Sequence, residues 1–173
     1  MRDILQDWKV NTGNTKGRLV LLSFRLAQKI RRAPKPIFWL GIPYLVFYRL
    51  LIEWVLCIEL PWNTQVGPSL RLYHGMGLVV NDQTVIGRNV ALRHNTTIGV
   101  KETLPFGTRA APTIGDDVDI GAHVVILGPI TVGSGARIGA GSVVVKDVPE
   151  GATVVGNPAR VIHIATMPEA TCA

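Results

Sequence analysis

The chain has 173 residues, which suits one domain with an appendage. Hydrophobic residues make up 47% of it and aromatic residues only 6%, so the core must be built mainly from aliphatic side chains. A formal net charge of +6 favours an anionic partner, but no nucleic-acid-binding motif accompanies it, and we expect no nucleic acid as ligand. The polar N-terminus does not have the form of a signal peptide, and we expect Cys57 and Cys172 to be free thiols in the reducing cytoplasm.

A first helix is predicted within an N-terminal helical region that spans residues 1–58. Residues 19–30 carry apolar side chains too densely for the alternation of a strand, and prolines follow at positions 34 and 36. Residues 16–35 hold seven basic side chains and no acidic one. Because an apolar stretch comes directly after, residues 16–58 are expected to be able to contact an anionic membrane surface peripherally, at the inner face of the membrane.

A second apolar run covers residues 37–58 and is long enough to cross a bilayer. Arg49 and Glu53 lie near the middle of such a span, where each charge would be costly. Pro43 is expected to break the first half of the run. We therefore predict short helices that pack against each other or against a partner subunit, in preference to a transmembrane helix.

Residues 66–144 place an aliphatic residue at every sixth position, often followed by glycine. The period is interrupted twice, by two added residues before Ile86 and by ten between Ile98 and Ile114. Small residues often stand two places before the next aliphatic one. The twelve periodic positions are Val66, Leu72, Leu78, Ile86, Leu92, Ile98, Ile114, Ile120, Ile126, Val132, Ile138 and Val144.

A six-residue period fits neither one stripe of an α-helix nor the alternation of a plain strand. It fits short strands joined by tight corners, with the aliphatic residue pointing inward and glycine easing the corner. Three hexapeptides close a triangular coil, so the repeats predict a mainly β fold, a parallel β-helix of about four coils. We place this catalytic domain at residues 59–163, with an extended loop at 99–113 and a C-terminal tail at 164–173.

Two histidines fall at one corner of this predicted prism. Counting two residues on from Leu72 and Leu92 places His74 and His94 at equivalent positions of adjacent coils, about 4.8 Å apart along the axis. The same count leads to alanines in the later coils, which leaves room for a slender ligand. The loop at 99–113 departs close to His94 and could cover this corner. His123 and His163 have no such support and are expected to be surface residues.

Four segments resemble the hexapeptide-repeat acyltransferases over residues 59–162. They are YHGMGLVVN at 73–81, LRHNTTIG at 92–99, IGAGSVVVKDVP at 138–149 and GNPARVI at 156–162. The chain is most similar to serine acetyltransferases and, more closely, to colanic acid and capsular polysaccharide O-acetyltransferases. The resemblance implies a left-handed β-helix, a homotrimer and acetyl-CoA as co-substrate, with no metal.

The same resemblance implies a catalytic pair. His74 matches the catalytic histidine of the family, and Glu59 matches a carboxylate that pairs with it, an aspartate in serine acetyltransferases. A neutral imidazole can take the proton of an acceptor hydroxyl as its oxygen attacks the thioester, while the carboxylate stabilises the imidazolium. Direct transfer without an acyl-enzyme is expected, since neither cysteine lies within the coils.

The acceptor side departs from the serine acetyltransferase pattern. Those enzymes carry an aspartate before the catalytic histidine, where this chain has Tyr73, and a serine-binding histidine before a loop proline, where it has Ala111. The polysaccharide branch has a histidine at the position of His94. The resemblance therefore implies a sugar hydroxyl as acceptor in exopolysaccharide or capsule biosynthesis, held by His94 and Arg93.

Coenzyme contacts of the family map onto the backbone at Ala122, Ala140 and Val145, with Lys146 and Arg160 near the phosphates. Backbone amides at a coil edge can bond the pantetheine arm, and the two cations suit the 3′-phosphate end.

Four other functions stay open at this point. Serine O-acetyltransferase activity is the main alternative. A γ-type carbonic anhydrase uses a similar prism but needs three histidines converging on zinc. A non-enzymatic trimeric scaffold at a membrane is another alternative. Other acceptors of acetyl groups, such as nucleotide sugars or antibiotics, remain as well.

Overall fold

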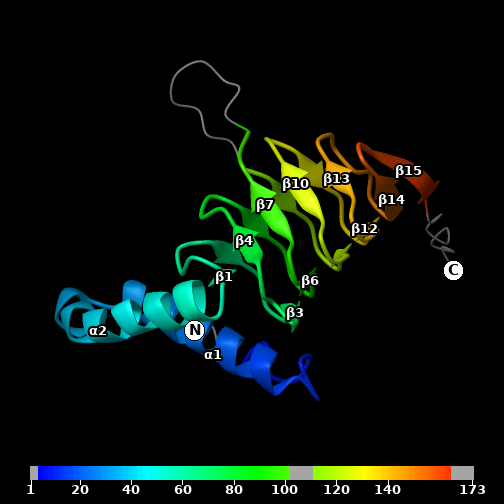
Figure 1. Ribbon diagram of the computed structural model, residues 1–173. Helices are drawn as coiled ribbons and strands as arrows, with labels where there is room; N and C mark the ends of the chain where they lie inside the picture. Colours follow the sequence, from blue (N-terminus) through cyan, green and yellow to red (C-terminus); the bar gives the residue numbers. More distant parts are fainter. Residues whose placement is uncertain (1–3, 102–110, 165–173) are drawn as a thin grey trace, which may run out of the picture.

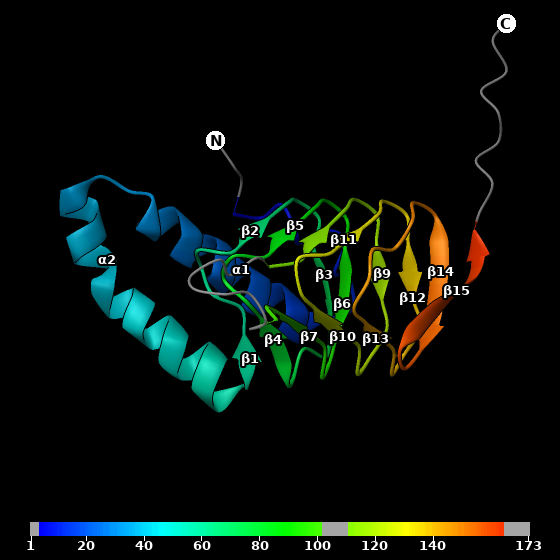
Figure 2. The same cartoon turned by 90° about the horizontal axis from the view of Figure 1, so that it is seen from above.

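The hexapeptide repeats form a parallel β-solenoid of about four turns, with two helices packed at its N-terminal end (Figure 1). The structure, a computed structural model, describes residues 4–101 and 111–164. Each turn contributes one short strand to each of three sheets, so the strands of successive turns lie side by side along the axis (Figure 2). The predicted mainly β fold with a short helical N-terminal segment is confirmed.

The three sheets run the length of the solenoid. The first sheet contains β1 (Ile58–Glu59), β4 (Leu78–Val80), β7 (Thr97–Gly99), β10 (Val125–Leu127) and β13 (Val143–Val144). The second contains β2 (Gln65–Val66), β5 (Val85–Ile86), β8 (Thr113–Ile114) and β11 (Thr131–Val132). The third contains β3 (Arg71–Tyr73), β6 (Ala91–Arg93), β9 (Asp119–Ile120), β12 (Arg137–Ile138), β14 (Ala152–Gly156) and β15 (Ala159–Ile164).

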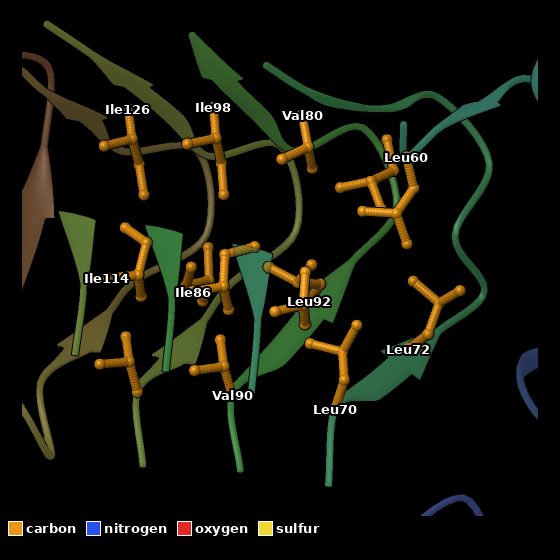
Figure 3. Close-up of a cluster of buried hydrophobic side chains, with 14 of the residues drawn as sticks. Leu60, Leu70, Leu72, Val80, Ile86, Val90, Leu92, Ile98, Ile114 and Ile126 are labelled. Atoms are coloured by element: carbon orange, nitrogen blue, oxygen red, sulfur yellow. The ribbon is translucent and has the colours of Figure 1, made fainter. Parts of the chain in front are cut away.

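The periodic aliphatic residues form the core. All twelve are at most 2% exposed. Those labelled in Figure 3 stack in columns inside the prism, such as Ile86 with Ile114 and Ile98 with Ile126. The small residues two places earlier are buried with them, including Thr96, Val118 and Ala136. Burial of stacked aliphatic side chains therefore holds the turns together without any aromatic ring in this part of the core.

The register differs from the sequence prediction in the first turn. Val80, not Leu78, stands beside Ile98, while Leu78 stands beside Ile58 of β1. The two added residues therefore lie between Leu72 and Val80 and not between Leu78 and Ile86. Leu78 and Val80 are both aliphatic and both buried, so the period alone could not tell them apart.

Two helices precede the solenoid. The first, α1 (Thr15–Arg31), begins at Asn14, whose side chain accepts a hydrogen bond of 2.9 Å from the backbone N–H of Gly17. The second, α2 (Lys35–Tyr48), continues into a short π-helical segment, η1 (Arg49–Val55). The expected break at Pro43 is wrong. Pro43 lies on the exposed side of α2, where water can bond the Trp39 carbonyl that its missing N–H leaves without a donor.

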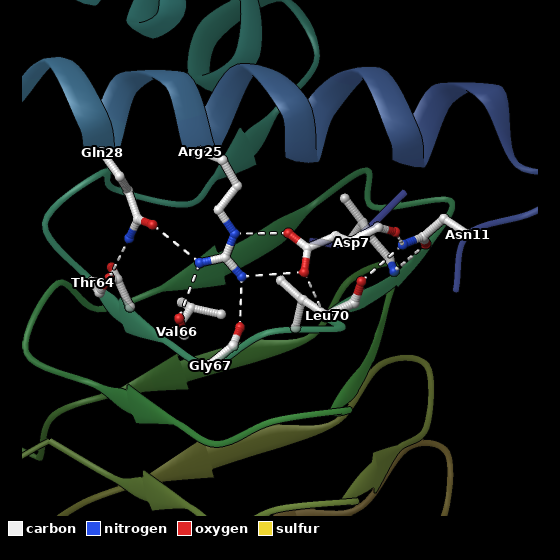
Figure 4. A network of polar contacts seen from close by, with 9 residues as sticks. Asp7, Asn11, Arg25, Gln28, Thr64, Val66, Gly67 and Leu70 are labelled. Atoms are coloured by element: carbon white, nitrogen blue, oxygen red, sulfur yellow. Dashed lines mark hydrogen bonds and ion pairs between the residues drawn. The ribbon is translucent and has the colours of Figure 1, made fainter. Parts of the chain in front are cut away.

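The segment before α1 pairs with the free edge of the first turn (Figure 4). Asp7 accepts a hydrogen bond of 2.8 Å from the N–H of Leu70. Asn11 accepts one of 3.0 Å from the N–H of Leu72 and donates one of 2.8 Å to the carbonyl of Leu70. These side chains occupy the place that a preceding strand would take, so the edge of β3 is not left open.

Arg25 of α1 completes this cap from the next side of the prism. Its guanidinium donates to the carbonyls of Val66 and Gly67, at 3.0 and 2.6 Å, and forms an ion pair of 2.7 Å with Asp7. Both charged side chains are buried. Arg25, one of the seven basic residues of the 16–35 stretch, is therefore a structural residue and not part of a basic surface.

The other end of the solenoid closes differently. Val148 stands beside Val132, and Val154 of β14 beside Ile138, so a partial further turn follows the fourth. The chain then reverses, and β15 pairs with β14 in antiparallel fashion. A reversed strand does not continue the parallel stacking, so β15 ends the array.

Candidate active site

His74 lies in the turn that holds the two added residues. The turn leaves β3 after Tyr73 and has left-handed backbone at His74, with φ of 66°, and again at Gly75 and Gly77. The N–H of Gly77 donates a hydrogen bond of 2.8 Å to the carbonyl of Cys57, which ties the turn to the residue before β1. The turn thus carries the His74 imidazole outward at a corner of the prism, where it is exposed.

Three imidazole rings meet at this corner. The ring centroids of His74 and His94 are 5.8 Å apart, and those of His94 and His123 are 5.1 Å apart, each pair edge to face. Nδ2 of Asn95 lies 3.4 Å from Nε2 of His123. The expected pairing of His74 with His94 is present, and His123 is exposed as expected, but its ring joins the cluster, which the sequence analysis did not predict.

Backbone bonds between turns define the column of this corner. The N–H groups of Asn95, His123 and Gly141 donate to the carbonyls of Met76, His94 and Ala122 respectively, at 2.8, 3.1 and 2.9 Å. The column is therefore occupied by Met76, His94, Ala122 and then Ala140. His74 precedes it by two residues. Counted forward from the paired residues Tyr73 of β3 and Arg93 of β6, His74 and His94 hold equivalent positions, as predicted. Counted back from the paired residues Val80 of β4 and Ile98 of β7, the residue equivalent to His94 is Met76 instead.

His94 is the inner ring of the three. Its Nδ1 is buried and has no hydrogen-bond partner among the described residues. A buried polar nitrogen without a partner is uncommon and is often explained by a ligand or water. His74 is exposed where an acceptor can approach, whereas His94 is half-buried behind it and presents unsatisfied hydrogen-bonding capacity.

Arg93 does not point freely into this corner. Its guanidinium stacks on the ring of Tyr73, 5.2 Å from the centroid, and forms an ion pair with Asp119. It also donates a hydrogen bond of 2.7 Å to the carbonyl of Ile120. The structure thus brings Arg93 beside the histidine corner but engages its charge along the outer face of the third sheet.

Glu59 lies in β1, in register with Val79 of β4, and its side chain is exposed. Both Glu59 and His74 are in the described part of the chain, and they form no hydrogen bond or ion pair with each other. They are nevertheless linked through the backbone, because the His74 turn bonds to Cys57 two residues before Glu59. The two residues of the catalytic pair implied by the resemblance are therefore joined through the backbone, with no hydrogen bond or ion pair between their side chains.

The residues predicted to hold the coenzyme fall in two places. Ala122 and Ala140 continue the column below His94. Val145, Lys146 and Arg160 line one groove of about 350 Å³ near the C-terminal end of the solenoid. Small side chains along the column, followed by two exposed cations, fit an elongated thiol cofactor that ends in phosphates.

Two other expectations can be placed only partly. Of the loop at 99–113, residues 102–110 lie outside the described residues, as does Cys172. Cys57 is an exposed free thiol. Within residues 4–101 and 111–164, no group of three or more His, Cys, Asp or Glu side chains is arranged to hold a metal ion.

The chain is similar to known acetyltransferases. A family model for the bacterial transferase hexapeptide, of six repeats, matches residues 111–146. Over 162 residues the chain is 35% identical to WcaB of Escherichia coli strain K12, a protein named for a proposed role as a colanic acid biosynthesis acetyltransferase. That match covers 91% of this chain and 98% of WcaB. The chain belongs to the hexapeptide-repeat acetyltransferases.

Serine acetyltransferases are also similar to this acetyltransferase. Serine acetyltransferase 4 of Arabidopsis thaliana is 38% identical over 149 residues, covering 85% of this chain and 39% of the plant protein. A structure of soybean serine acetyltransferase complexed with serine superposes with a TM-score of 0.75 at 32% identity, covering 92% of this chain and 68% of that one. A serine acetyltransferase in complex with CoA gives a TM-score of 0.70 at 29% identity, with 90% and 60% covered.

Proposed function

We propose that this acetyltransferase moves the acetyl group of acetyl-CoA to a sugar hydroxyl in exopolysaccharide or capsule biosynthesis. The observation that carries the proposal is the cluster of an exposed His74 against His94, whose Nδ1 lacks a partner. The similarity to WcaB over nearly the whole of both chains supports a carbohydrate acceptor. So do Tyr73 and Ala111, which stand where serine acetyltransferases carry an aspartate and a serine-binding histidine.

In the proposed reaction His74 acts as general base. Its neutral imidazole takes the proton of the acceptor hydroxyl while that oxygen attacks the thioester carbonyl carbon. The tetrahedral intermediate then collapses, the carbon–sulfur bond breaks, and the imidazolium returns its proton to the departing thiolate of CoA. Glu59 is the proposed counter-charge for the imidazolium, and its exposed side chain must rotate toward the His74 turn to bond it.

His94 is proposed to orient the acceptor through Nδ1, which has no protein partner but is buried, so the ring must turn outward to present it. Arg93 would assist only by exchanging its bond to Asp119 for one to the sugar. The pantetheine arm is proposed to lie along Ala122 and Ala140, with the phosphates at Lys146 and Arg160. The serine acetyltransferase complex with CoA supports coenzyme binding on this fold.

The test is release of CoA from acetyl-CoA, followed with a thiol reagent, with a panel of glycans or L-serine as acceptor. We expect glycan-dependent release that falls roughly 10²–10⁴-fold in His74→Ala. His163→Ala is the matched control, because His163 is exposed on β15 and takes no part in the cluster. Unchanged release by His74→Ala would exclude His74 as the base.

The second candidate is serine O-acetyltransferase, favoured by the serine-bound soybean structure that superposes on this chain. Release with L-serine and with no glycan would establish this function in place of the first. In that case the acceptor would need ligands other than a histidine before Pro112, since Ala111 stands there. Failure to bind acetyl-CoA at all would contradict both candidates.

A further inference from the structure

The helix formed by α2 and η1 is apolar on all sides, yet the protein covers only one of them. Leu45, Tyr48 and Ile52 face the rest of the molecule and are buried. The opposite side is an exposed stripe at alternating spacings of four and three residues, as one face of a helix requires. This exposed stripe consists of Pro36, Leu40, Pro43, Phe47, Leu50 and Trp54, flanked by Ile37, Trp39 and Val46.

Charge is absent from the exposed stripe. Between Lys35 and Cys57 the sequence has two charged residues, Arg49 and Glu53, and these form an ion pair of 3.3 Å with each other. The guanidinium of Arg49 also lies 4.9 Å from the ring centroid of Trp62, on the side of the solenoid. The Glu53 side chain is 14% exposed, and its burial raises the pKa of the carboxyl. Glu53 thus turns toward the protein, whereas Arg49 is 56% exposed beside the stripe and is neutralised by its pair with Glu53.

Basic side chains border the stripe where α1 meets α2. Lys29, Arg32 and Lys35 are exposed, and none has an ion-pair partner within the described residues. Lys29 and Arg32 line one open groove together with the apolar Ile37, so cationic and apolar groups adjoin there. Such a border is what a surface carrying both acyl chains and anionic headgroups would match.

The helix is anchored to the protein, which sets the geometry of any membrane contact. The segment Lys35–Val55 is long and apolar enough to cross a bilayer. Crossing would require it to leave the protein, since Tyr48 is fully buried and its hydroxyl donates a hydrogen bond of 2.8 Å to the carbonyl of Leu60. Docking of the exposed stripe in the plane of the interface keeps that bond.

We propose that the exposed stripe of α2 and η1 docks this acetyltransferase on the surface of an anionic phospholipid bilayer. The apolar side chains enter the boundary between headgroups and acyl chains, while Lys29, Arg32 and Lys35 contact the headgroup phosphates. Trp39 and Trp54, near the two ends of the stripe, suit the polar–apolar boundary at which tryptophan gathers. The three free cations favour lipid over a second copy of the same basic surface.

Vesicle flotation tests this proposal without reference to acetyl transfer. The probes are vesicles of phosphatidylcholine alone and of phosphatidylcholine with phosphatidylglycerol at two to one. Wild-type protein is expected to float with the anionic vesicles. The double variant Leu40→Asp/Phe47→Asp is expected to lose at least about tenfold in partition coefficient, because two charges would enter the apolar boundary.

A second set of variants removes the border charges. The triple variant Lys29→Gln/Arg32→Gln/Lys35→Gln is expected to weaken binding to anionic vesicles by at least about tenfold. Each charge contributes at most roughly fivefold in affinity. The matched controls are Ile162→Asp, an exposed apolar residue of β15, and Lys9→Gln/Lys101→Gln/Arg137→Gln, which removes three exposed charges elsewhere. Both controls should float like the wild type.

Three results would overturn the proposal. The first is folded wild-type protein that stays with the soluble fraction. The second is a wild-type protein that binds no vesicles, together with a lower oligomeric mass of Leu40→Asp/Phe47→Asp in sedimentation. That pair of results would show that a second copy covers the stripe. The third is retention in cell membranes after alkaline carbonate washing, which would show a spanning helix. CoA release with a soluble acceptor should persist in the stripe variant and separates failure of docking from failure of the proposed function.

Discussion

The histidine corner depends on residues that accept a left-handed backbone. Gly77, Asn95, His123 and Gly141 occupy equivalent positions in successive turns, with φ of 67°, 54°, 58° and 71°. Asparagine and histidine tolerate this conformation better than most residues with a side chain. At Gly77 a second constraint is added, since a Cβ there would lie 2.0 Å from Oδ1 of Asn95.

Replacing Gly77 by alanine should therefore disturb the corner. Gly77→Ala and Gly141→Ala both place alanine at positive φ and should each cost about 1 kcal/mol in free energy of unfolding. Only Gly77→Ala also displaces the Asn95 amide from the ring of His123. We expect shifted imidazole NMR signals of His123 in Gly77→Ala but not in Gly141→Ala, where nothing lies within 4 Å of the new Cβ. Equal spectra in the two variants would contradict this account.

Sequence reasoning found two of the three histidines. His74 and His94 could be paired because both follow a strand by the same count. His123 was missed because it stands one residue later in its turn, and backbone position alone does not show that an imidazole is long enough to reach back to the preceding turn. The sequence did contain a clue: His123 holds the same position in its turn as Asn95, which directly follows His94 in the preceding turn. The lack of a bond between Glu59 and His74 could not be foreseen either, because it depends on side-chain rotamers.

At the scale of elements, the solenoid ends are closed by contrasting means. At the N-terminal end Asp7, Asn11 and Arg25 bond backbone groups of the first turn, and at the C-terminal end β15 reverses direction. The six-residue period predicted which residues form the core, because burial selects them turn after turn. It could not predict the cap, since its residues obey no period and their polar side chains resemble those of any exposed helix.

The buried ion pair makes the cap sensitive to mutation. Arg25→Ala removes the partner of buried Asp7 and leaves the carbonyls of Val66 and Gly67 without donors, so we expect a loss of about 3–5 kcal/mol in free energy of unfolding. Arg88→Ala breaks the exposed pair with Asp116 and should cost at most about 1 kcal/mol. Urea unfolding measures both. Similar losses in the two variants would show that the cap contributes little.

At the scale of the whole molecule, a single chain leaves the histidine corner uncovered. Tyr73 and Met76 flank His74 and are 38% and 58% exposed. A neighbouring subunit packed on this corner would cover them and enclose His74, the proposed base. The family resemblance implies a homotrimer, and neither the six-residue period nor the structure of one chain contains that information.

Sedimentation equilibrium tests the trimer directly. The wild-type protein is expected to have three times the mass of the 18.8-kDa chain. Met76→Asp should shift the protein toward single chains, because it would place a charge in the subunit contact. Ile162→Asp, at a residue that is 64% exposed but lies on β15, should leave the mass unchanged. A wild-type protein of single-chain mass would exclude the trimer.

The number of stacked turns sets the length of the proposed coenzyme path along the solenoid axis. His74 belongs to the first turn, whereas Lys146 follows β13 in the fourth, three strand spacings further along the first sheet. At about 4.8 Å per spacing, the two ends of the proposed coenzyme path are separated by roughly 14 Å along the axis. This separation changes only in whole steps, because adding or deleting one coil moves the cationic groove by one strand spacing. The number of repeats therefore determines how long a cofactor must be to extend from the cationic groove to His74.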